Sequence, residues 1–380
     1  MTTTINNKNK KPNVPNLRFK EFQGEWEEST IGEMFDLYSG NTPSRLNKEH
    51  FKGTVNWISS GELKEHYIYS SKEQISEEAA KSLKLLPVGT FVIAIYGLEA
   101  EGVRGTGSII QEPSTISQAC MSFIPKGVIE NEFLYSWYKK HGNVIGIRYA
   151  QGTKQQNLSY DILEKFRIAY PNTKEQEKLN KFISLLDERI STQSKIIEKM
   201  QTLIKGIAHK VSKQGKPNIR LSECLLCTSS TLQESDVAEV GAYPVYGANG
   251  IVGYLDTYNT TSEAIYIIKD GSGVGAVSCV KGKCSATGTL NILQTKEGFS
   301  LRYLYFILKV FSFEPYKTGM AIPHIYFKDY GKAKIYCPSN QLQCKYADLL
   351  SKIEQKATAE QKILDNLCSQ KQYLLCQMFI

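Results

Sequence analysis

The spacing of apolar residues changes at Pro171, where a mixed pattern gives way to a long helical one. From residue 174 to residue 211 there is no proline and only one glycine, Gly206. This segment predicts an uninterrupted helix about 57 Å long, at a rise of about 1.5 Å per residue. Its apolar residues recur at alternating steps of four and three, the spacing of a coiled coil. The positions of this seam are Leu179, Ile183, Leu186, Ile190, Gln193, Ile197, Met200, Ile204, Ile207 and Val211. A stripe this narrow over about five heptads favours a coiled coil over an amphipathic helix packed on a globular core.

A second copy of the pattern follows 167 residues later, the difference between Pro171 and Pro338. Other pairs at this offset are Gly152 with Gly319, Leu158 with Ile325, Ile168 with Ile335 and Ile183 with Leu350. Carried through the seam, the offset gives Tyr346, Leu350, Ile353, Ala357, Glu360, Leu364, Leu367, Lys371, Leu374 and Met378. Glu360 takes the place of Gln193, and a polar residue within a seam costs stability but can fix the register. The sequence therefore predicts an internal pseudo-repeat whose two long helices form an antiparallel coiled coil.

A globular segment, here called a head, precedes each helix. In the first head we expect strands over 54–59, 90–97 and 119–125 and a helix over 130–143. In the second head we expect strands over 264–271, 275–282 and 289–295 and a helix over 300–311. Both heads are therefore expected to be α/β (α+β). The predicted organisation is a flexible N-terminal arm (1–25), the first head (26–171), a helix (172–214), the second head (215–338) and a helix (339–380).

Composition adds a weak indication of the partner. The chain has 46 Lys and Arg against 38 Asp and Glu, a net charge of +8, which favours an anionic partner such as nucleic acid. No apolar run approaches the roughly 20 residues that span a bilayer, and the N-terminus is polar and basic. We therefore expect no signal peptide, no membrane contact and a cytoplasmic location. Nine cysteines, an odd number scattered over the chain, are expected to be buried thiols in a reducing compartment.

Two motifs suggest chemistry but have simpler explanations. Residues 270–277, DGSGVGAV, resemble a glycine-rich phosphate loop, but a strand rather than a helix is expected to follow, so a tight hairpin is favoured. Cys224 and Cys227 form a C-x-x-C pair, with Cys279 and Cys284 later in the same head. Four thiolates could bind zinc, but the second spacing is atypical and ordinary buried thiols are preferred.

Catalytic signatures are missing from the sequence. The five histidines, His50, His66, His141, His209 and His324, show no ligand spacing, so none is assigned a metal or catalytic role. The chain has neither the Asn/Asp-Pro-Pro-aromatic motif of an adenine methyltransferase nor the G-x-x-x-x-G-K-S/T motif of an ATP-driven translocase. We therefore expect a chain that is not an enzyme and needs no cofactor or metal.

The order head, helix, head, helix resembles the specificity subunits of type I restriction-modification systems over nearly the whole chain. Residues 13–44, NVPNLRFKEFQGEWEESTIGEMFDLYSGNTPS, and residues 243–255, YPVYGANGIVGYL, are similar to stretches of that family. The loop GTKQQNLSYDILEKFRIAYP at residues 152–171 is equally typical, whereas its counterpart GMAIPHIYFKDYGKAKIYCP at residues 319–338 departs more. The resemblance implies that each head is a target recognition domain. It also implies a non-catalytic subunit that binds double-stranded DNA, two methyltransferase subunits and, through that complex, restriction subunits.

Contact with DNA requires cations for phosphates and amide or guanidinium groups for base edges. The candidates in the first head are Tyr96, Arg104, Lys154, Gln155, Gln156 and Asn157. Those in the second head are Tyr243, Tyr246, Asn249, Lys269, Lys281 and Lys283. Heads separated by about a helix length would read two half-sites about 10 to 17 base pairs apart.

Two other classes of protein remain open from the sequence. A coiled-coil scaffold that binds proteins with both heads would lack salt-sensitive, sequence-dependent DNA binding. A self-sufficient DNA enzyme would cleave or methylate DNA when purified alone.

Overall fold

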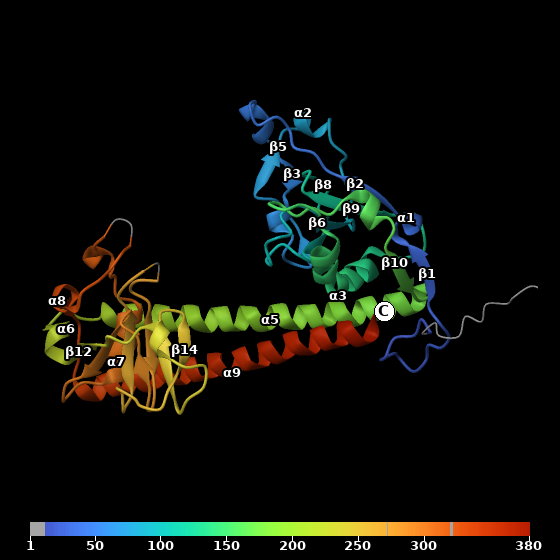
Figure 1. Ribbon diagram of the computed structural model, residues 1–380. Coiled ribbons are helices and arrows are strands. Elements are labelled where there is room, and N and C mark those ends of the chain that lie inside the picture. The colour runs from blue at the N-terminus through green and yellow to red at the C-terminus, as the bar shows by residue number, and fades with distance from the viewer. Residues whose placement is uncertain (1–11, 272, 320–321) are drawn as a thin grey trace, which may run out of the picture. The chain divides into compact units, whose positions relative to one another are not determined.

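Two compact units make up the chain, in a computed structural model that describes residues 12–271, 273–319 and 322–380. Unit 1 contains the residues up to Thr192 together with Leu364–Ile380, and unit 2 contains Gln193–Ile363. Each long helix, α5 (Thr173–Ser212) and α9 (Asn340–Met378), is shared between the units (Figure 1). The units therefore divide the chain differently from the five segments predicted above, which cut at the ends of the helices. None of the described helices combines the length and apolarity needed to cross a membrane.

Unit 1 is built on a five-stranded sheet in the order β2-β9-β6-β7-β4, accompanied by a three-stranded sheet in the order β5-β3-β8. Its elements are β1 (Glu27–Thr30), α1 (Ile31–Met34), β2 (Phe35–Ser39), η1 (Lys48–Phe51), β3 (Val55–Ile58), η2 (Ser60–Glu62), β4 (Tyr67–Ile68), β5 (Glu73–Ile75), α2 (Glu77–Ala80), β6 (Phe91–Ala94), β7 (Gly107–Ile110), β8 (Ser114–Ile116), β9 (Cys120–Pro125), α3 (Asn131–Tyr149), α4 (Tyr160–Leu163) and β10 (Arg167–Tyr170). Alternate residues of β6 and β9 face a core shared with α3 and the long helices. The predicted strands β3, β6 and β9 and the predicted helix α3 are confirmed.

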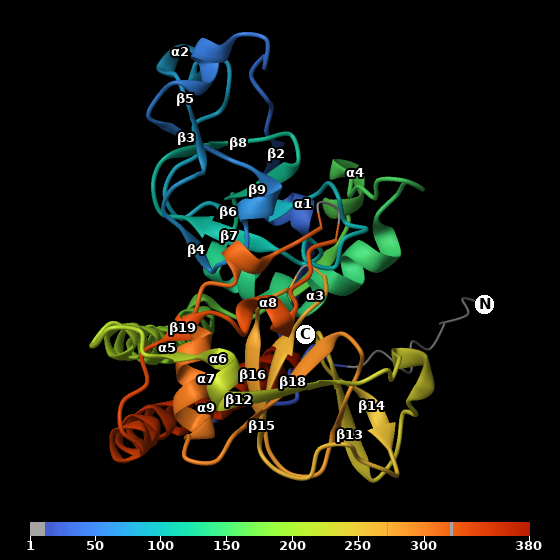
Figure 2. The same ribbon diagram turned by 90° about the vertical axis from the view of Figure 1, so that its left-hand side faces the viewer.

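Unit 2 repeats this plan with a four-stranded sheet, β12-β18-β15-β16, and a small sheet, β14-β13-β17 (Figure 2). Its elements are β11 (Ile219–Arg220), α6 (Leu221–Cys224), β12 (Leu225–Ser229), η3 (Glu234–Asp236), β13 (Tyr243–Gly247), β14 (Gly250–Leu255), β15 (Ala264–Ile268), β16 (Val277–Val280), β17 (Ser285–Ala286), β18 (Leu290–Thr295), α7 (Leu301–Lys309), η4 (Glu314–Tyr316), α8 (Phe327–Tyr330) and β19 (Lys334–Ile335). The predicted strands β15, β16 and β18 and the predicted helix α7 are confirmed.

The pseudo-repeat extends to individual elements. Strand β1 pairs with β10 as β11 pairs with β19, and α4 and α8 begin 167 residues apart. Strands β9 and β18 both begin and end 170 residues apart. The predicted duplication of an α/β head followed by a long helix is therefore confirmed.

The long helices run antiparallel within each unit. In unit 1, Asp187 of α5 forms an ion pair with Lys371 of α9. In unit 2, Nε2 of Gln193 donates a hydrogen bond to Oε2 of Glu360 at 2.6 Å, and the Tyr346 hydroxyl donates to Gln214 at 2.7 Å. Residue numbers rise along one helix as they fall along the other, as predicted. All twenty seam positions are buried or half-buried, including Leu179, Ile183, Leu186, Ile190, Ile197, Leu350, Ile353, Leu364 and Leu367.

A buried glutamine joins each head to its long helix. In unit 1, Gln176 accepts from the Glu130 amide at 3.0 Å and donates to the Pro171 carbonyl at 2.9 Å. In unit 2, Gln343 makes the same two bonds to Ser300 and Pro338, at 3.0 and 2.9 Å. Because these backbone groups lie at the ends of helices and lack helical partners, the glutamines satisfy them.

The segment before β1 is only partly described. Residues 1–11 of the predicted flexible arm lie outside the described residues. In the remainder, the Arg18 guanidinium donates from Nε and Nη2 to the two carboxylate oxygens of Glu175 of α5, each at 2.7 Å. The Leu17 amide donates to the Gln377 carbonyl of α9 at 3.0 Å. Residues 12–25 are thus held against the long helices, which differs from the prediction of a flexible arm.

Candidate nucleic-acid interface

Two candidate segments of the first head lie together in one loop cluster. The Leu98 amide donates to the Gln156 carbonyl at 3.0 Å, and the Gln156 amide donates to Oε2 of Glu99 at 2.9 Å. Gln151 and Asn157 close the second loop by two mutual backbone hydrogen bonds of 2.8 Å. Its turn requires a glycine at position 152, because φ there is 120° and a Cβ would lie 2.1 Å from the Gln155 carbonyl oxygen.

The six first-head candidates divide by exposure. Lys154 and Gln155 are exposed at the loop tip, where they are free to reach a ligand. Gln156, Asn157 and Tyr96 are half-buried and build the loop cluster, Tyr96 bridging to Asn157. The Arg104 side chain lies along α3, since a Cβ on Gly146 would meet Cγ of Arg104 at 2.9 Å, and Nη2 donates to the Glu99 carbonyl at 3.4 Å. The Nε atom of this half-buried side chain is itself buried and has no hydrogen-bond partner among the described residues.

The second head contains the same loop despite its different sequence. Thr318 and His324 close it with backbone hydrogen bonds of 2.9 and 2.8 Å, and Gly319 has a φ of 88°. The Ile325 amide donates to the Lys269 carbonyl at 2.9 Å, as the Leu158 amide does to Ile95 in unit 1. Lys269 is thus half-buried beside the loop. The closing hydrogen bonds and the glycine are retained, while the sequence has Ala321 and Ile322 at the positions of Lys154 and Gln155 in the repeat.

A second group of candidates gathers on the small sheet of unit 2. The rings of Tyr243 and Tyr258 meet edge to face at 4.9 Å, and Nζ of Lys283 lies 4.8 Å from Tyr258 and 5.9 Å from Tyr243. Asn249 is exposed in the turn between β13 and β14, before Gly250. Tyr258 was not identified from the sequence, because it lies in a loop with no distinguishing pattern. An exposed lysine on an aromatic pair can contact a phosphate while the rings meet sugars or bases.

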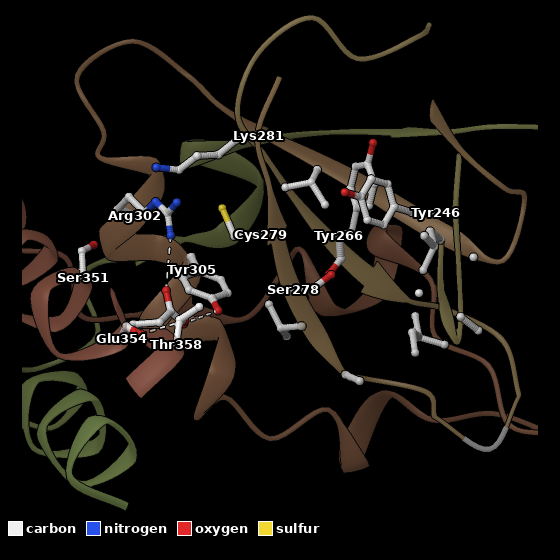
Figure 3. Close-up of a pocket in the computed structure, with 18 of the residues that line it drawn as sticks. Tyr246, Tyr266, Ser278, Cys279, Lys281, Arg302, Tyr305, Ser351, Glu354 and Thr358 are labelled. Atoms are coloured by element: carbon white, nitrogen blue, oxygen red, sulfur yellow. Dashed lines mark hydrogen bonds and ion pairs between the residues drawn. The ribbon is translucent and has the colours of Figure 1, made fainter. Parts of the chain in front are cut away.

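Tyr246 and Lys281 line a cavity of about 920 Å³ beside strand β16 (Figure 3). Arg302 and Tyr305 of α7 and Glu354 of α9 form another wall. Glu354 accepts from the Tyr305 hydroxyl at 2.7 Å, from Lys309 at 3.2 Å and from Arg302 at 3.4 Å. Two of the second-head candidates therefore line this cavity, and Tyr243, Asn249, Lys269 and Lys283 are not among its lining residues.

The corresponding place in unit 1 holds a buried histidine that was given no role from the sequence. The side chain of His66 is 9% exposed. Its Nε2 lies 2.9 Å from Glu132 and its Nδ1 lies 3.0 Å from Asp187. The ring stacks between Tyr67 and Tyr135, with centroids 4.1 and 3.9 Å away. Since both ring nitrogens face carboxylates, both carry protons when both bonds are made, and the ring is then an imidazolium.

These contacts and burial shift the pKa values of His66, Asp187 and Lys139. Burial alone would lower the pKa of His66, but its hydrogen bonds to Asp187 and Glu132 and their charges outweigh burial and raise the pKa above its usual value. Burial alone would raise the pKa of Asp187, but His66 and Lys371 together lower it. Burial and the nearby charge of Lys371 lower the pKa of Lys139 to about 8. The internal repeat of the sequence could have pointed to the residues around His66. Glu132, Tyr135 and Lys139 correspond to Arg302, Tyr305 and Lys309 at an offset of 170.

The two remaining motifs of the second head have structural roles. Residues 270–276, apart from residue 272, which lies outside the described residues, belong to the connection between the antiparallel strands β15 and β16, so these strands form a hairpin whose connection is longer than the tight turn expected. Cys224 belongs to the core beneath α7, whereas Cys284 belongs to a separate core on the other face of the sheet. Their separation means that the four thiols do not form one site. Among the described residues, no group of three or more His, Cys, Asp or Glu side chains is arranged to hold a metal ion.

Comparison with known proteins gives a consistent picture. The model of the type I restriction modification DNA specificity domain matches residues 23–202 and again residues 224–368. The chain is 29% identical over 185 residues to the type I restriction enzyme MjaIX specificity subunit of Methanocaldococcus jannaschii, and 31% identical over 176 residues to the EcoR124I/EcoR124II specificity subunit of Escherichia coli. These matches cover 46% and 45% of this chain and 42% and 43% of the relatives, less than half of each.

A solved structure extends the likeness to the whole fold. The crystal structure of the type I restriction-modification S subunit from M. genitalium matches with a TM-score of 0.65 and 20% identity. The match covers 97% of this chain and 99% of the M. genitalium chain. At this identity the match shows a shared fold.

Proposed function

Because the chain belongs to the type I restriction-modification DNA specificity family, we propose that it is the sequence-specific DNA-recognition subunit of such a complex. Each head reads one half of a bipartite double-stranded DNA target. The chain itself is not catalytic, and it binds two methyltransferase subunits and, through them, the restriction subunits. Its place of action is then the cytoplasm, where its DNA substrate lies.

One observation carries this proposal: the head is duplicated, but the exposed side chains of the two copies differ. Both heads share the order of four strands in the main sheet, β2-β9-β6-β7 and β12-β18-β15-β16, a loop with a glycine at positive φ and a glutamine that joins the head to a long helix. The loop tip nevertheless offers Lys154 and Gln155 in the first head and apolar Ile322 in the second. One scaffold that presents two different surfaces suits the reading of two different half-sites.

The direct test maps N6-methyladenine in the genome of cells that express the chain with its methyltransferase subunit, and of cells that lack only the chain. We expect a two-part motif with a fixed gap, methylated only when the chain is present. Methylation that is unchanged by the chain, while the methyltransferase is active with another specificity subunit, would contradict the proposal. A coiled-coil scaffold would give that second result.

A further inference from the structure

The cavity beside β16 corresponds to a place that a strand of the same chain fills in unit 1. In unit 1, β7 has β6 on one side and β4 on the other. In unit 2, β16 corresponds to β7 and has β15 on one side, and no strand of the described residues lies on its other side. The free edge of β16 borders the cavity, as Figure 3 shows around Ser278 and Cys279.

The residues that hold β4 in unit 1 have counterparts on the walls of this cavity. The backbone of residues 65–68 accepts hydrogen bonds from the Ser108 hydroxyl at 2.6 Å and from the amides of Ile109 and Gln111 at 2.8 Å. At an offset of 170 these three residues become Ser278, Cys279 and Lys281, which all line the cavity.

The side-chain contacts of β4 have counterparts too. Glu132, Tyr135, Ser184 and Asp187 contact His66 or Tyr67. Glu132 and Tyr135 correspond to Arg302 and Tyr305, at an offset of 170. Ser184 and Asp187 correspond to Ser351 and Glu354, at an offset of 167. All four counterparts line the cavity.

The backbone of β16 is oriented to accept a strand. The Ile268 amide donates to the Ala276 carbonyl at 3.0 Å, and amides alternate in direction along an antiparallel ladder. The amide of Cys279 therefore points away from β15 toward the cavity, as the amide of Ile109 points toward β4. A free strand edge of this kind pairs readily with an extended peptide.

We propose that the groove beside β16 binds an extended segment of the methyltransferase subunit, which pairs with β16 as β4 pairs with β7. This inference rests on the proposed function for the identity of the partner. The segment occupies in the second head the place that residues 65–68 of the chain itself occupy in the first.

Charge and shape specify the side chains of the bound segment. In unit 1, Glu132 accepts a hydrogen bond from the Tyr67 hydroxyl, and Arg302 takes the place of Glu132 in unit 2. The residue of the bound segment at the position of Tyr67 is therefore acidic. The guanidinium already contacts Glu263 and Glu354, but it has five donors and lies near Lys281 at the cavity rim. The next residue, at the position of Ile68, is aliphatic because Tyr246, Tyr266 and Leu290 line that side.

Photo-cross-linking within the assembled complex tests this inference. p-Benzoylphenylalanine is placed at Gln355, which is exposed and lines the groove, and in a control at Lys352, which is exposed on the same helix outside it. The complex of the full chain with its methyltransferase subunit on DNA is irradiated and digested for mass spectrometry. We expect the Gln355 adduct to map to one short methyltransferase segment with adjacent acidic and aliphatic residues, and the Lys352 adduct not to.

Adducts with DNA alone, or none at Gln355 in an intact complex, would overturn the inference and leave the proposed function standing. Failure of the complex to assemble would count against the proposed function instead. A fluorescein-labelled peptide of the captured segment should bind the full chain, and replacing its acidic residue by lysine should weaken binding at least tenfold by fluorescence anisotropy. Equal affinity of the two peptides would overturn the inference that an acidic residue of the segment contacts Arg302. Since that change lies in the peptide, misfolding of the protein cannot cause the result.

Discussion

At the scale of single residues, His66 has the greatest electrostatic consequence. Its ring lies between two carboxylates that come from different helices and is a cation when it donates to both, and one of these carboxylates, Asp187, also pairs with Lys371. Removing a buried cation leaves charges without a partner, which costs far more than removing an exposed ion pair.

His66→Gln should destabilise the chain by about 3 kcal/mol at pH 6, because Glu132 and Asp187 then lose their shared cation. The folded pKa of His66 is raised, so its stabilisation is complete below about pH 6.5 and is lost as the pH rises through the folded pKa. The difference between wild type and variant in urea unfolding should therefore shrink between pH 6 and pH 9. His209→Gln, at an exposed position of α5, is the control. A difference that grows with pH would contradict the assignment of an imidazolium.

At the scale of elements, the glutamine joints hold each head helix on its long helix. Gln176 and Gln343 are buried and bond backbone groups that have no partner inside a helix. A leucine at either position would leave an amide and a carbonyl unpaired.

Gln176→Leu and Gln343→Leu should each lower the free energy of unfolding by about 2 kcal/mol. Gln201→Leu changes an exposed residue of α5 and should have an effect within about 0.5 kcal/mol. Chemical denaturation of the three variants measures the difference. Equal stability of Gln176→Leu and Gln201→Leu would show that water replaces the lost bonds.

The sequence predicted the elements well where local pattern decides them. The long helices follow from seam spacing and from the absence of proline after Pro171, and the main strands follow from short apolar runs. Strand β4 was not predicted, because its two residues are ordered by pairing with β7 and by the His66 contacts rather than by their own propensity.

The candidate site was predicted less completely for a related reason. Lys154 and Gln155 stand on a loop that a glycine pattern reveals, so their exposure could be anticipated. The grouping of Tyr243 with Tyr258 and Lys283 depends on contacts between a strand and two loops, which one sequence without related sequences does not show.

At the scale of the whole molecule, both long helices run continuously from one compact unit into the other. Inserting seven residues after Thr192 of α5 and seven after Ile363 of α9 preserves the seam, because a heptad returns each residue to its place. The added length of about 10 Å should lengthen the unspecified gap of the DNA target by about three base pairs. Methylation mapping should show the same half-sites around the longer gap. Insertion in α5 alone, the matched control, should abolish methylation, and altered half-sites would contradict the idea that the helices set the spacing.

The central claim, one head for each half-site, is tested most directly by mapping N6-methyladenine motifs for two double variants beside wild type. One variant carries Lys154→Ala and Gln155→Ala, and the other carries Tyr243→Ala and Lys283→Ala. The account predicts that each variant relaxes or weakens only one half of the motif, a different half in each case, with the gap unchanged. Loss of preference in both halves from either variant, or in the same half from both, would contradict it.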